Sequence, residues 1–460
     1  MISFTLATRK QEMVEALCEL LRVKSVKGEP QGMMPYGSDL FFALNKMLNF
    51  AERMYFDSES MFSRLGYVDY GDGDEMLAIL THLDVVPEGS GWTVPAFGGM
   101  VKDGKIYGRG AIDNKGPAIA ALFALAAIQD DCISLNKRVR LIFGCDEESG
   151  WSDIEFYKKN GGEIPTMAFS PDAQFPIING EKGLLQLDLF KKADEELPQD
   201  GLRLLSISGG DRVNVVPAYC EAVLSAEKDD IKDLVDIFNT DVPVKVELLQ
   251  REDGLHLITR GLSAHGSLPE DGKNAISYLI AFLNTLPMKQ SYLSDAVYQL
   301  ARYTALQTDG QAMGIAGSDE HGALTLNLGY IKMEEDGLHA GLDIRYPISG
   351  DGDAIFDTVK EKMTAYEVEK RFAQRPHFVP EDSVLVQGLK AAYEESTGEK
   401  ATCMTIGGAT YARAFPNAVA FGPVFPGKVG TEHQPDEYIE IDDLVRLADI
   451  IANAIVTLCT

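Results

Sequence analysis

The sequence predicts an α/β protein whose first domain, a mixed sheet flanked by helices, is split by an inserted α+β domain with antiparallel sheets. Strand-like and helix-like segments alternate over residues 1–180. Apolar and polar side chains alternate along several segments of residues 181–375, which is typical of antiparallel sheets with one solvated face. The alternation of strands and helices returns over residues 376–460, so both ends of the chain are expected to build one domain.

Short apolar runs predict the elements of the first domain. Residues 76–83 form an apolar run that turns polar at its end, and residues 138–145 and 166–170 are two further strand candidates. Between the first two lies an apolar run at 118–128, opened by Pro117, a residue that is well tolerated in the first turn of a helix. Strand, helix and strand in this order predict a βαβ-type sheet with helices on its faces.

The inserted region predicts antiparallel strands separated by helices, one of them at 274–286. Its length of about 195 residues leaves room for two α+β units of about 100 residues each. After the insertion, apolar periodicity predicts a final helix at 441–458. The strands expected within the insertion are residues 184–190, 219–227, 255–262, 324–333 and 338–347.

The composition excludes several classes of function. Asp and Glu number 70 against 42 Lys and Arg, a formal net charge of −28, which repels phosphate backbones and anionic headgroups. We therefore expect neither nucleic-acid nor membrane binding. The longest apolar run is too short for a membrane span, and the N-terminal segment lacks the features of a signal peptide. The 6 cysteines show no paired short spacings, so we do not expect a disulfide scaffold. We expect a cytoplasmic location.

Side chains that favour metals gather just after the predicted strands and in a few later segments. Any one of them is a weak signal, because a lone buried histidine is usually structural and most carboxylates are solvated. Together they offer two imidazoles and several carboxylates without thiolates, a set that suits zinc, manganese or cobalt. The number of carboxylates indicates two ions that share a bridging group. The residues are His82, Asp84, Asp113, Glu147, Glu148, Asp172 and His433.

The order of these segments resembles one family over nearly the whole chain. The matching motifs are THLDVVPEG, YGRGAIDNKGP, DEESGW, INGEKG, GLSAHGSLPEDGKNA, GGATYAR and GTEHQPDE. They resemble the dinuclear metallopeptidase family of carnosinases, aminoacylases, acetylornithine deacetylase and succinyl-diaminopimelate desuccinylase. The resemblance is strongest to its bacterial dipeptidase V branch of Xaa-His dipeptidase-like enzymes. It implies a catalytic domain from residues 1–180 and 376–460, with residues 181–375 as an inserted lid.

The resemblance implies two divalent ions per chain, Zn²⁺ or Mn²⁺, with Co²⁺ as a further candidate. It implies that His82 and Asp172 are ligands of one ion. Glu148 and His433 would be ligands of the other, and Asp113 would bridge the two.

The resemblance also assigns roles beside the ligands. Asp84 would orient the ring of His82 and raise its basicity. Glu147 would be the general base, collecting the proton of a water held between the ions so that the hydroxide attacks the substrate carbonyl. A cis peptide bond between Asp113 and Asn114 is implied as well.

The remaining candidates concern the substrate. Taken alone, His265 reads as a turn residue and Arg345 as a strand-end arginine in a surface ion pair. The resemblance instead implies that His265 stabilises the tetrahedral intermediate and that Arg345 binds the substrate carboxylate. Asn214, Gly408 and Thr410 resemble the family's other substrate contacts.

The expected function is that of a metal-dependent dipeptidase acting on dipeptides with a free C-terminal carboxylate. An amidohydrolase of N-acyl amino acids, with the same chemistry, is the nearest alternative. A catalytically silent metal- or peptide-binding protein is a remote one, since such a relative has no need of Glu147. The resemblance implies that family members with a doubled lid can work as monomers, so the length of the insertion predicts a monomer. Hinge closure between lid and catalytic domain is also expected.

Overall fold

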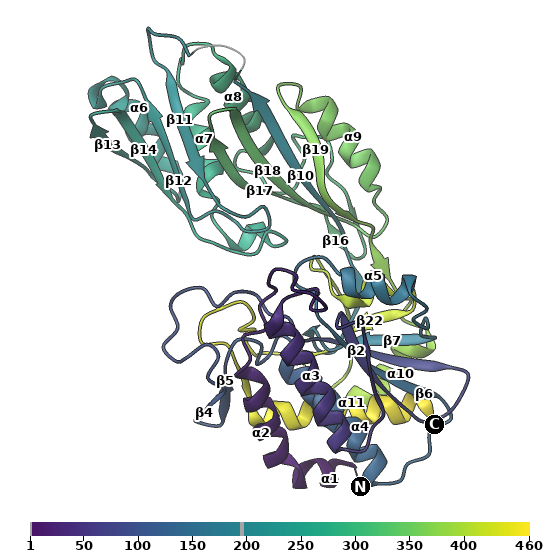
Figure 1. The fold of residues 1–460 in the computed structure, drawn as a ribbon. Coiled ribbons are helices and arrows are strands. Elements are labelled where there is room, and N and C mark those ends of the chain that lie inside the picture. Colours follow the sequence, from purple (N-terminus) through teal and green to yellow (C-terminus); the bar gives the residue numbers. More distant parts are fainter. Residues whose placement is uncertain (1, 194–196) are drawn as a thin grey trace. The chain divides into compact units, whose positions relative to one another are not determined.

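The computed structural model describes residues 2–193 and 197–460. The chain forms two compact units (Figure 1). Unit 1 comprises residues 2–180, Phe378–Met404 and Ala409–Thr460, and unit 2 comprises Glu181–His377 and Thr405–Gly408. The predicted fold class is confirmed, because unit 1 holds a mixed sheet flanked by helices and unit 2 an antiparallel sheet with helices. That the units are independently folding domains, and that the insertion holds two α+β parts, stays a prediction.

The main sheet of unit 1 has the strand order β1-β2-β6-β3-β7-β22-β9. Strands β3, β6, β7 and β22 run parallel, and the other pairings are antiparallel. The bounds are β1 Ser58–Met61, β2 Leu65–Tyr70, β3 Met76–His82, β6 Arg138–Gly144, β7 Met167–Ser170, β9 Ile177–Glu181 and β22 Ala418–Ala420. Two short strands, β20 (His377–Phe378) and β21 (Cys403–Ile406), lie where the chain passes between the units.

Helices cover this sheet, and two small sheets lie beside it. The helices are α1 Ile2–Thr8, α2 Lys10–Leu21, α3 Ser38–Arg53, α4 Lys115–Asp130, α5 Ser152–Lys159, α10 Val384–Thr397 and α11 Ile441–Cys459, with the 3₁₀ turn η2 Tyr411–Ala414. The small sheets pair β4 (Met100–Lys102), β5 (Lys105–Tyr107) and β24 (Tyr438–Glu440), and β8 (Ala173–Gln174) with β23 (Pro423–Val424).

Helix α4 explains how unit 1 presents a site at the edge of its sheet. Its side chains from Lys115 to Ile128 are buried, because the helix is apolar on every face and packs between β3, α2 and α11. Strand β3 is buried along its whole length, as expected for a central parallel strand. The polar residues that follow β3 and precede α4 are therefore held by the core of the unit.

Unit 2 is built on one antiparallel sheet of strand order β13-β14-β12-β11-β17-β18-β10-β19. Its apolar side chains form one core with helices α7 and α8. The strands are β10 Gly183–Lys192, β11 Leu204–Gly209, β12 Tyr219–Leu224, β13 Val246–Arg251, β14 Gly254–Arg260, β17 Thr325–Met333, β18 Gly337–Tyr346 and β19 Glu367–Gln374, with a separate hairpin of β15 (Ser318–Asp319) and β16 (Gly322–Ala323). The helices are α6 Lys228–Asp241, η1 Pro269–Asp271, α7 Ala275–Leu283, α8 Tyr292–Thr304 and α9 Gly352–Lys362. Across both stretches that the structure describes, the helices are all too short or too polar to cross a membrane.

Candidate metal centre

Three neighbouring parallel strands of unit 1 end at the candidate centre. The register pairs His82 at the end of β3 with Gly144 at the end of β6, and β7 runs parallel on the other side of β3. The carboxyl ends of parallel strands share one edge of a sheet, where ligands bind in open α/β folds. Glu147, Glu148 and Asp172 follow β6 and β7 within a few residues and so reach the same edge.

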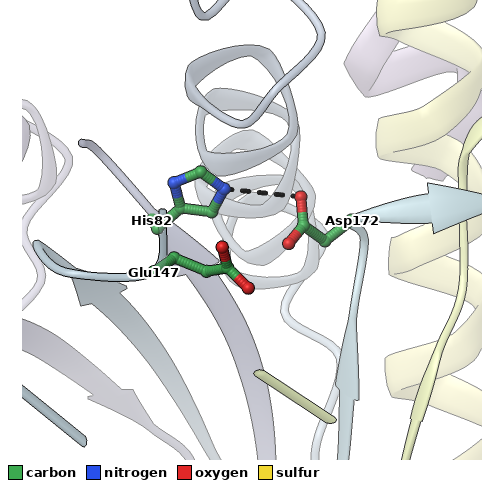
Figure 2. Close-up of side chains that lie close together, drawn as sticks. All are labelled: His82, Glu147 and Asp172. Atoms are coloured by element: carbon green, nitrogen blue, oxygen red, sulfur yellow. Dashed lines mark ion pairs between the residues drawn. The ribbon is translucent and has the colours of Figure 1, made fainter. Parts of the chain in front are cut away.

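Six of the seven predicted residues form two groups, and the ligand atoms within each group lie within 4.8 Å of one another. The first group is His82, Glu147 and Asp172, whose side chains point toward one another in Figure 2. His82 Nε2 lies 3.4 Å from Asp172 Oδ1. The second group is Asp113, Glu148 and His433, and His433 Nε2 lies 3.0 Å from Glu148 Oε1.

Asp113 links the two groups. Its Oδ1 lies 3.0 Å from His82 Nε2, and its Oδ2 lies 3.1 Å from His433 Nε2. Its peptide bond to Asn114 is cis, as the resemblance implies. One oxygen of this carboxylate therefore faces each group, the arrangement that a bridging ligand needs.

Asp84 organises the loop after β6 as well as His82. Its carboxylate accepts hydrogen bonds from the backbone N–H groups of Glu147 (3.1 Å) and Glu148 (2.9 Å). His82 Nδ1 hydrogen-bonds to the backbone carbonyl oxygen of Asp84 at 3.0 Å and lies 3.4 Å from its Oδ1. A carbonyl oxygen only accepts, so Nδ1 carries a proton and Nε2 is the atom that faces the two groups.

Burial and mutual repulsion govern the charges of the centre. Burial, reinforced by the charge of Asp172, raises the pKa of Glu147 well above its usual value. Burial likewise raises the pKa of Asp172 to about 6 and, with the charge of Asp113, raises that of Glu148. Although burial opposes it, hydrogen bonds to Asp113 and Glu148 raise the pKa of His433 to about 11. So many acids at one edge favour any positive charge placed among them.

The donor set fits divalent metal ions. His82 Nε2 and Glu147 Oε1 are buried and make no hydrogen bond to the residues that the structure describes, although carboxylate oxygens of Asp113 and Asp172 lie 3.0 and 3.4 Å from His82 Nε2. Buried polar atoms without partners are rare, and a cation would satisfy both. Imidazole nitrogen and carboxylate oxygen without thiolate are ligands that Zn²⁺ and Mn²⁺ accept.

Comparison with known proteins shows the family of the chain. Residues 78–457 match the model of the peptidase family M20/M25/M40. The chain belongs to this family. It is therefore a hydrolase, and the metallopeptidases of the family use divalent metals.

Relatives of this M20 peptidase cover nearly its full length. The "Putative dipeptidase YtjP" of Bacillus subtilis (strain 168) is 38% identical over an alignment of 460 positions that covers 97% of each chain. Human carnosine dipeptidase 1 shares the fold with a TM-score of 0.61 at 14% identity, covering 99% of this chain and 98% of the other. Aminoacylhistidine dipeptidase from Vibrio alginolyticus shares it with a TM-score of 0.59 at 15% identity, covering 96% of this chain and 95% of the other.

In this M20 peptidase, Asn114 is a site residue that the sequence analysis missed. Its Nδ2 donates to the carbonyl oxygen of Pro171 (2.7 Å) and to Asp172 Oδ1 (2.9 Å), and its Oδ1 accepts from the backbone N–H of His82 (3.4 Å). It thereby joins the ends of β3 and β7. The only signal in the sequence is its place directly after Asp113. Glu437, four residues after His433, was missed as well.

Two predicted substrate residues lie together in unit 2. The backbone N–H of Gly266 donates to the carbonyl oxygen of Asn214 at 2.7 Å, which places the neighbouring His265 beside Asn214. His265 Nδ1 lies 2.7 Å from Ser267 Oγ. The contact of either residue with a substrate stays a prediction.

Arg345 is not an exposed strand-end arginine in a surface ion pair, which is how the residue reads when it is taken alone. It is 4% exposed, and its Nε and Nη2 donate to the Asp343 carboxylate at 2.7 and 2.8 Å. Its Nη1 donates to the carbonyl oxygen of Gly407 at 2.5 Å, next to the predicted Gly408. Asp343 thus orients the guanidinium, and the role of Arg345 toward a substrate stays a prediction.

Thr410 lies in unit 1 at the start of η2. Its hydroxyl accepts from the backbone N–H of Ala412 at 3.2 Å. The neighbouring Tyr411 donates to Asp153 Oδ2 at 2.5 Å, and the same oxygen accepts from the backbone N–H of Cys145 at 2.7 Å. This segment is therefore anchored to the loop that carries Glu147 and Glu148.

An open pocket of about 960 Å³ in unit 1 adjoins the centre. Asp84 and Glu148 line one part of it, and Lys27, Tyr36 and Arg64 line another. Its size is that of a site for a small ligand.

A third group of possible metal ligands, Glu334, Asp336 and His339, lies at the turn between β17 and β18. Glu334 pairs with Lys332 at 2.6 Å, and Asp336 pairs with His339 at 2.9 Å. Both carboxylates of this third group therefore already have a side-chain partner.

Proposed function

We propose that this protein is a metal-dependent dipeptidase that hydrolyses dipeptides with a free C-terminal carboxylate. The observation that carries the proposal is the position of Asp113, with one carboxylate oxygen toward each of two ligand groups and Glu147 beside them. The dipeptidase names of its relatives support the choice of substrate.

The residues of the centre would hold two divalent ions, Zn²⁺ or Mn²⁺. His82 and Asp172 would bind one, Glu148 and His433 the other, and Asp113 both. Ions bound there supply a Lewis acid for the peptide carbonyl and lower the pKa of a water molecule.

Glu147 acts as the general base in this proposal. Its burial raises its pKa, so the carboxylate gains affinity for a proton relative to an exposed glutamate. Its Oε1, which lacks a partner among the described residues, takes the proton of the attacking water. The same oxygen then donates that proton to the departing amine nitrogen.

The residues of unit 2 would recognise the substrate. We propose that His265 donates to the oxygen of the tetrahedral intermediate and that Arg345 binds the free carboxylate through N–H groups that Asp343 and Gly407 leave available. Asn214, Gly408 and Thr410 would complete the contacts. We further propose a cytoplasmic monomer, and a dimer mass independent of protein concentration in light scattering would contradict the monomer.

The test is hydrolysis by chelator-stripped protein re-supplied with Mn²⁺ or Zn²⁺. The substrates are a dipeptide panel that includes carnosine, beside N-acetyl and N-succinyl amino acids. Glu147→Ala is the key variant, and Glu155→Ala, an exposed glutamate of α5, is the matched control.

We expect metal-dependent dipeptide cleavage that Glu147→Ala abolishes and Glu155→Ala leaves intact. Turnover of the acylated compounds alone would instead make the protein an N-acyl amino acid amidohydrolase. Metal binding without turnover of either class would favour a silent binding protein. Activity that survives Glu147→Ala would show that another residue is the base.

A further inference from the structure

A fully buried carboxylate supports the loop that carries Asp113. Glu437 is 0% exposed, and its Oε1 accepts from the backbone N–H groups of Ile112 (3.0 Å) and Asp113 (3.2 Å). Its Oε2 accepts from the backbone N–H of Gly110 (3.1 Å) and from Arg109 Nη1 (2.8 Å). Each oxygen already accepts two hydrogen bonds, so Glu437 has no lone pair left for a metal ion.

Arg109 joins the same loop to the segment after His433. It is 2% exposed, and its Nη1 also donates to the carbonyl oxygen of Gln434 at 3.3 Å. Its guanidinium lies 5.2 Å from the ring centroid of Trp92. Among the described residues Glu437 is its only carboxylate partner, so loss of that carboxylate would leave a buried unpaired charge.

The residue before Glu437 makes a second anchor. Asp436 accepts from the backbone N–H and the hydroxyl of Thr93, both at 2.8 Å, and from the backbone N–H of Val94 at 3.4 Å. The backbone φ is +61° at His433 and +56° at Asp436, in the left-handed region that non-glycine residues rarely adopt. Such a turn depends on contacts from outside it.

We propose that Asp436 and Glu437 form a clamp that positions His433 and Asp113 for the same pair of metal ions. Glu437 sets the backbone from which Asp113 projects, and Asp436 holds the turn that presents His433. Both are positioning residues and neither contacts the metal. The inference rests on the proposed metal centre. It explains how two ligands that are 320 positions apart in the sequence are held close together.

The test measures metal binding apart from catalysis. In Glu437→Gln, an amide NH₂ replaces one oxygen, so either orientation directs a donor at two other donors. We expect Mn²⁺ affinity of the chelator-stripped protein to fall about 10–100-fold, the range typical of residues that orient ligands. The visible absorption of the Co²⁺-loaded protein should change as well, because the ligand geometry changes.

A partly buried ion pair elsewhere in unit 1 is the control. Arg140 donates to Asp69 through Nε (2.7 Å) and Nη2 (2.6 Å). Asp69→Asn should lower the melting temperature of the stripped protein, as Glu437→Gln does, but should leave Mn²⁺ affinity and the Co²⁺ spectrum unchanged. A purely structural role for Glu437 would make the two variants alike.

A second comparison covers the case that Glu437→Gln does not fold. Asp436→Ala removes all three hydrogen bonds, whereas Asp436→Asn keeps the acceptor for both backbone N–H groups. We expect weaker Mn²⁺ binding in Asp436→Ala and rescue in Asp436→Asn. If Glu437→Gln folds and keeps the Mn²⁺ affinity and Co²⁺ spectrum of the wild-type protein, the clamp is overturned and the metal centre is not. If only Asp436→Ala folds, the same result in that variant overturns the clamp alone. A wild-type protein that binds no Mn²⁺, Zn²⁺ or Co²⁺ would overturn the proposed metal centre and the clamp together.

Discussion

Asp84 shows how one carboxylate can organise several functional residues. The resemblance implied a partner for the His82 ring, and the ring does lie 3.4 Å from Asp84 Oδ1. The stronger contacts of the carboxylate are with the backbone of Glu147 and Glu148. Asp84 therefore aligns residues of both ligand groups although it belongs to neither.

Asp84→Asn should weaken the metal centre without unfolding the protein. In the wild-type protein both backbone N–H groups donate to carboxylate oxygens of Asp84. In the variant the amide NH₂ would face one of these N–H groups, and because both are donors the loop of Glu147 and Glu148 must shift. We expect Mn²⁺ affinity to fall about 10–100-fold, with a comparable loss in kcat/KM. Titration calorimetry and dipeptide hydrolysis check this, with Asp69→Asn as control. Unchanged Mn²⁺ affinity would show that Asp84 does not position the ligands.

His256 in unit 2 should make stability depend on pH. Burial lowers its pKa, but hydrogen bonds to Asp253 (2.8 Å) and Glu221 (2.6 Å) outweigh burial and raise it. A folded-state pKa above the unfolded one stabilises the fold below the unfolded pKa of about 6.5, and this stabilisation is lost as pH rises through the folded pKa.

His256→Gln should therefore lower the melting temperature more at acid than at alkaline pH. We expect a loss of about 2–4 °C at a pH near 5.5 and a smaller loss near pH 9. Thermal unfolding of both proteins across this range measures the difference. An equal loss at both pH values would mean that the charged imidazole contributes nothing.

At the scale of single elements, the first turn of α4 depends on a close backbone approach. A Cβ on Gly116 would lie 2.1 Å from the carbonyl oxygen of Ala111, in the loop that leads to Asp113. The clashing atom belongs to the backbone of Ala111, which cannot move aside as the end of a flexible side chain can. The absence of a side chain at this position therefore lets the loop lie against the buried helix.

Gly116→Ala should separate this loop from α4. We expect a loss of about 1–3 kcal/mol in unfolding free energy, the usual cost of overpacking, together with weaker Mn²⁺ binding. Gly317→Ala is the matched control, because a Cβ there meets no atom within 4 Å. Denaturant unfolding and metal titration of both variants provide the comparison. Equal stability of the two would refute the steric argument.

At the scale of the whole molecule, the inserted unit has a core of its own. The buried apolar residues that pack together in unit 2 all lie between Leu185 and Val368. The ends of the insertion pair with each other, since Leu184 of β10 is opposite Gln374 of β19. An insertion whose ends lie together can interrupt a domain without distorting it.

A fragment of residues 181–377 should therefore fold alone. We expect a near-ultraviolet circular dichroism signal and one cooperative thermal transition. A fragment of residues 1–180 is the counterpart of similar length. It should not fold, because the core of unit 1 also needs α10 and α11. Cooperative folding of that fragment, or none in 181–377, would contradict this division.

Much of the fold was predictable because local pattern and burial agree. The apolar runs at 76–83, 138–145 and 166–170 became β3, β6 and β7, and the apolar run after Pro117 became α4. The expected helix at 441–458 is α11, Ile441–Cys459. These segments are buried on most faces, so a run of apolar residues marks them without knowledge of their neighbours.

The candidate ligands were likewise predictable from residue type and order. Imidazoles and carboxylates that follow strand ends lie at one edge of a parallel sheet, whatever the later packing. Residue type and order alone did not divide them into two groups around Asp113. The resemblance implied that division, and the structure supplied the distances, which depend on segments far apart in the sequence.

The supporting hydrogen bonds could not be predicted. Glu437 accepts from the backbone of Gly110, 327 positions away, and Asn114 donates to Asp172, 58 positions away. Their partners are largely backbone atoms, which every residue possesses, so no pattern of side chains reveals them. Residue type and order thus determined the fold class and the candidate ligands, whereas the positioning contacts arise only when distant backbone segments pack together.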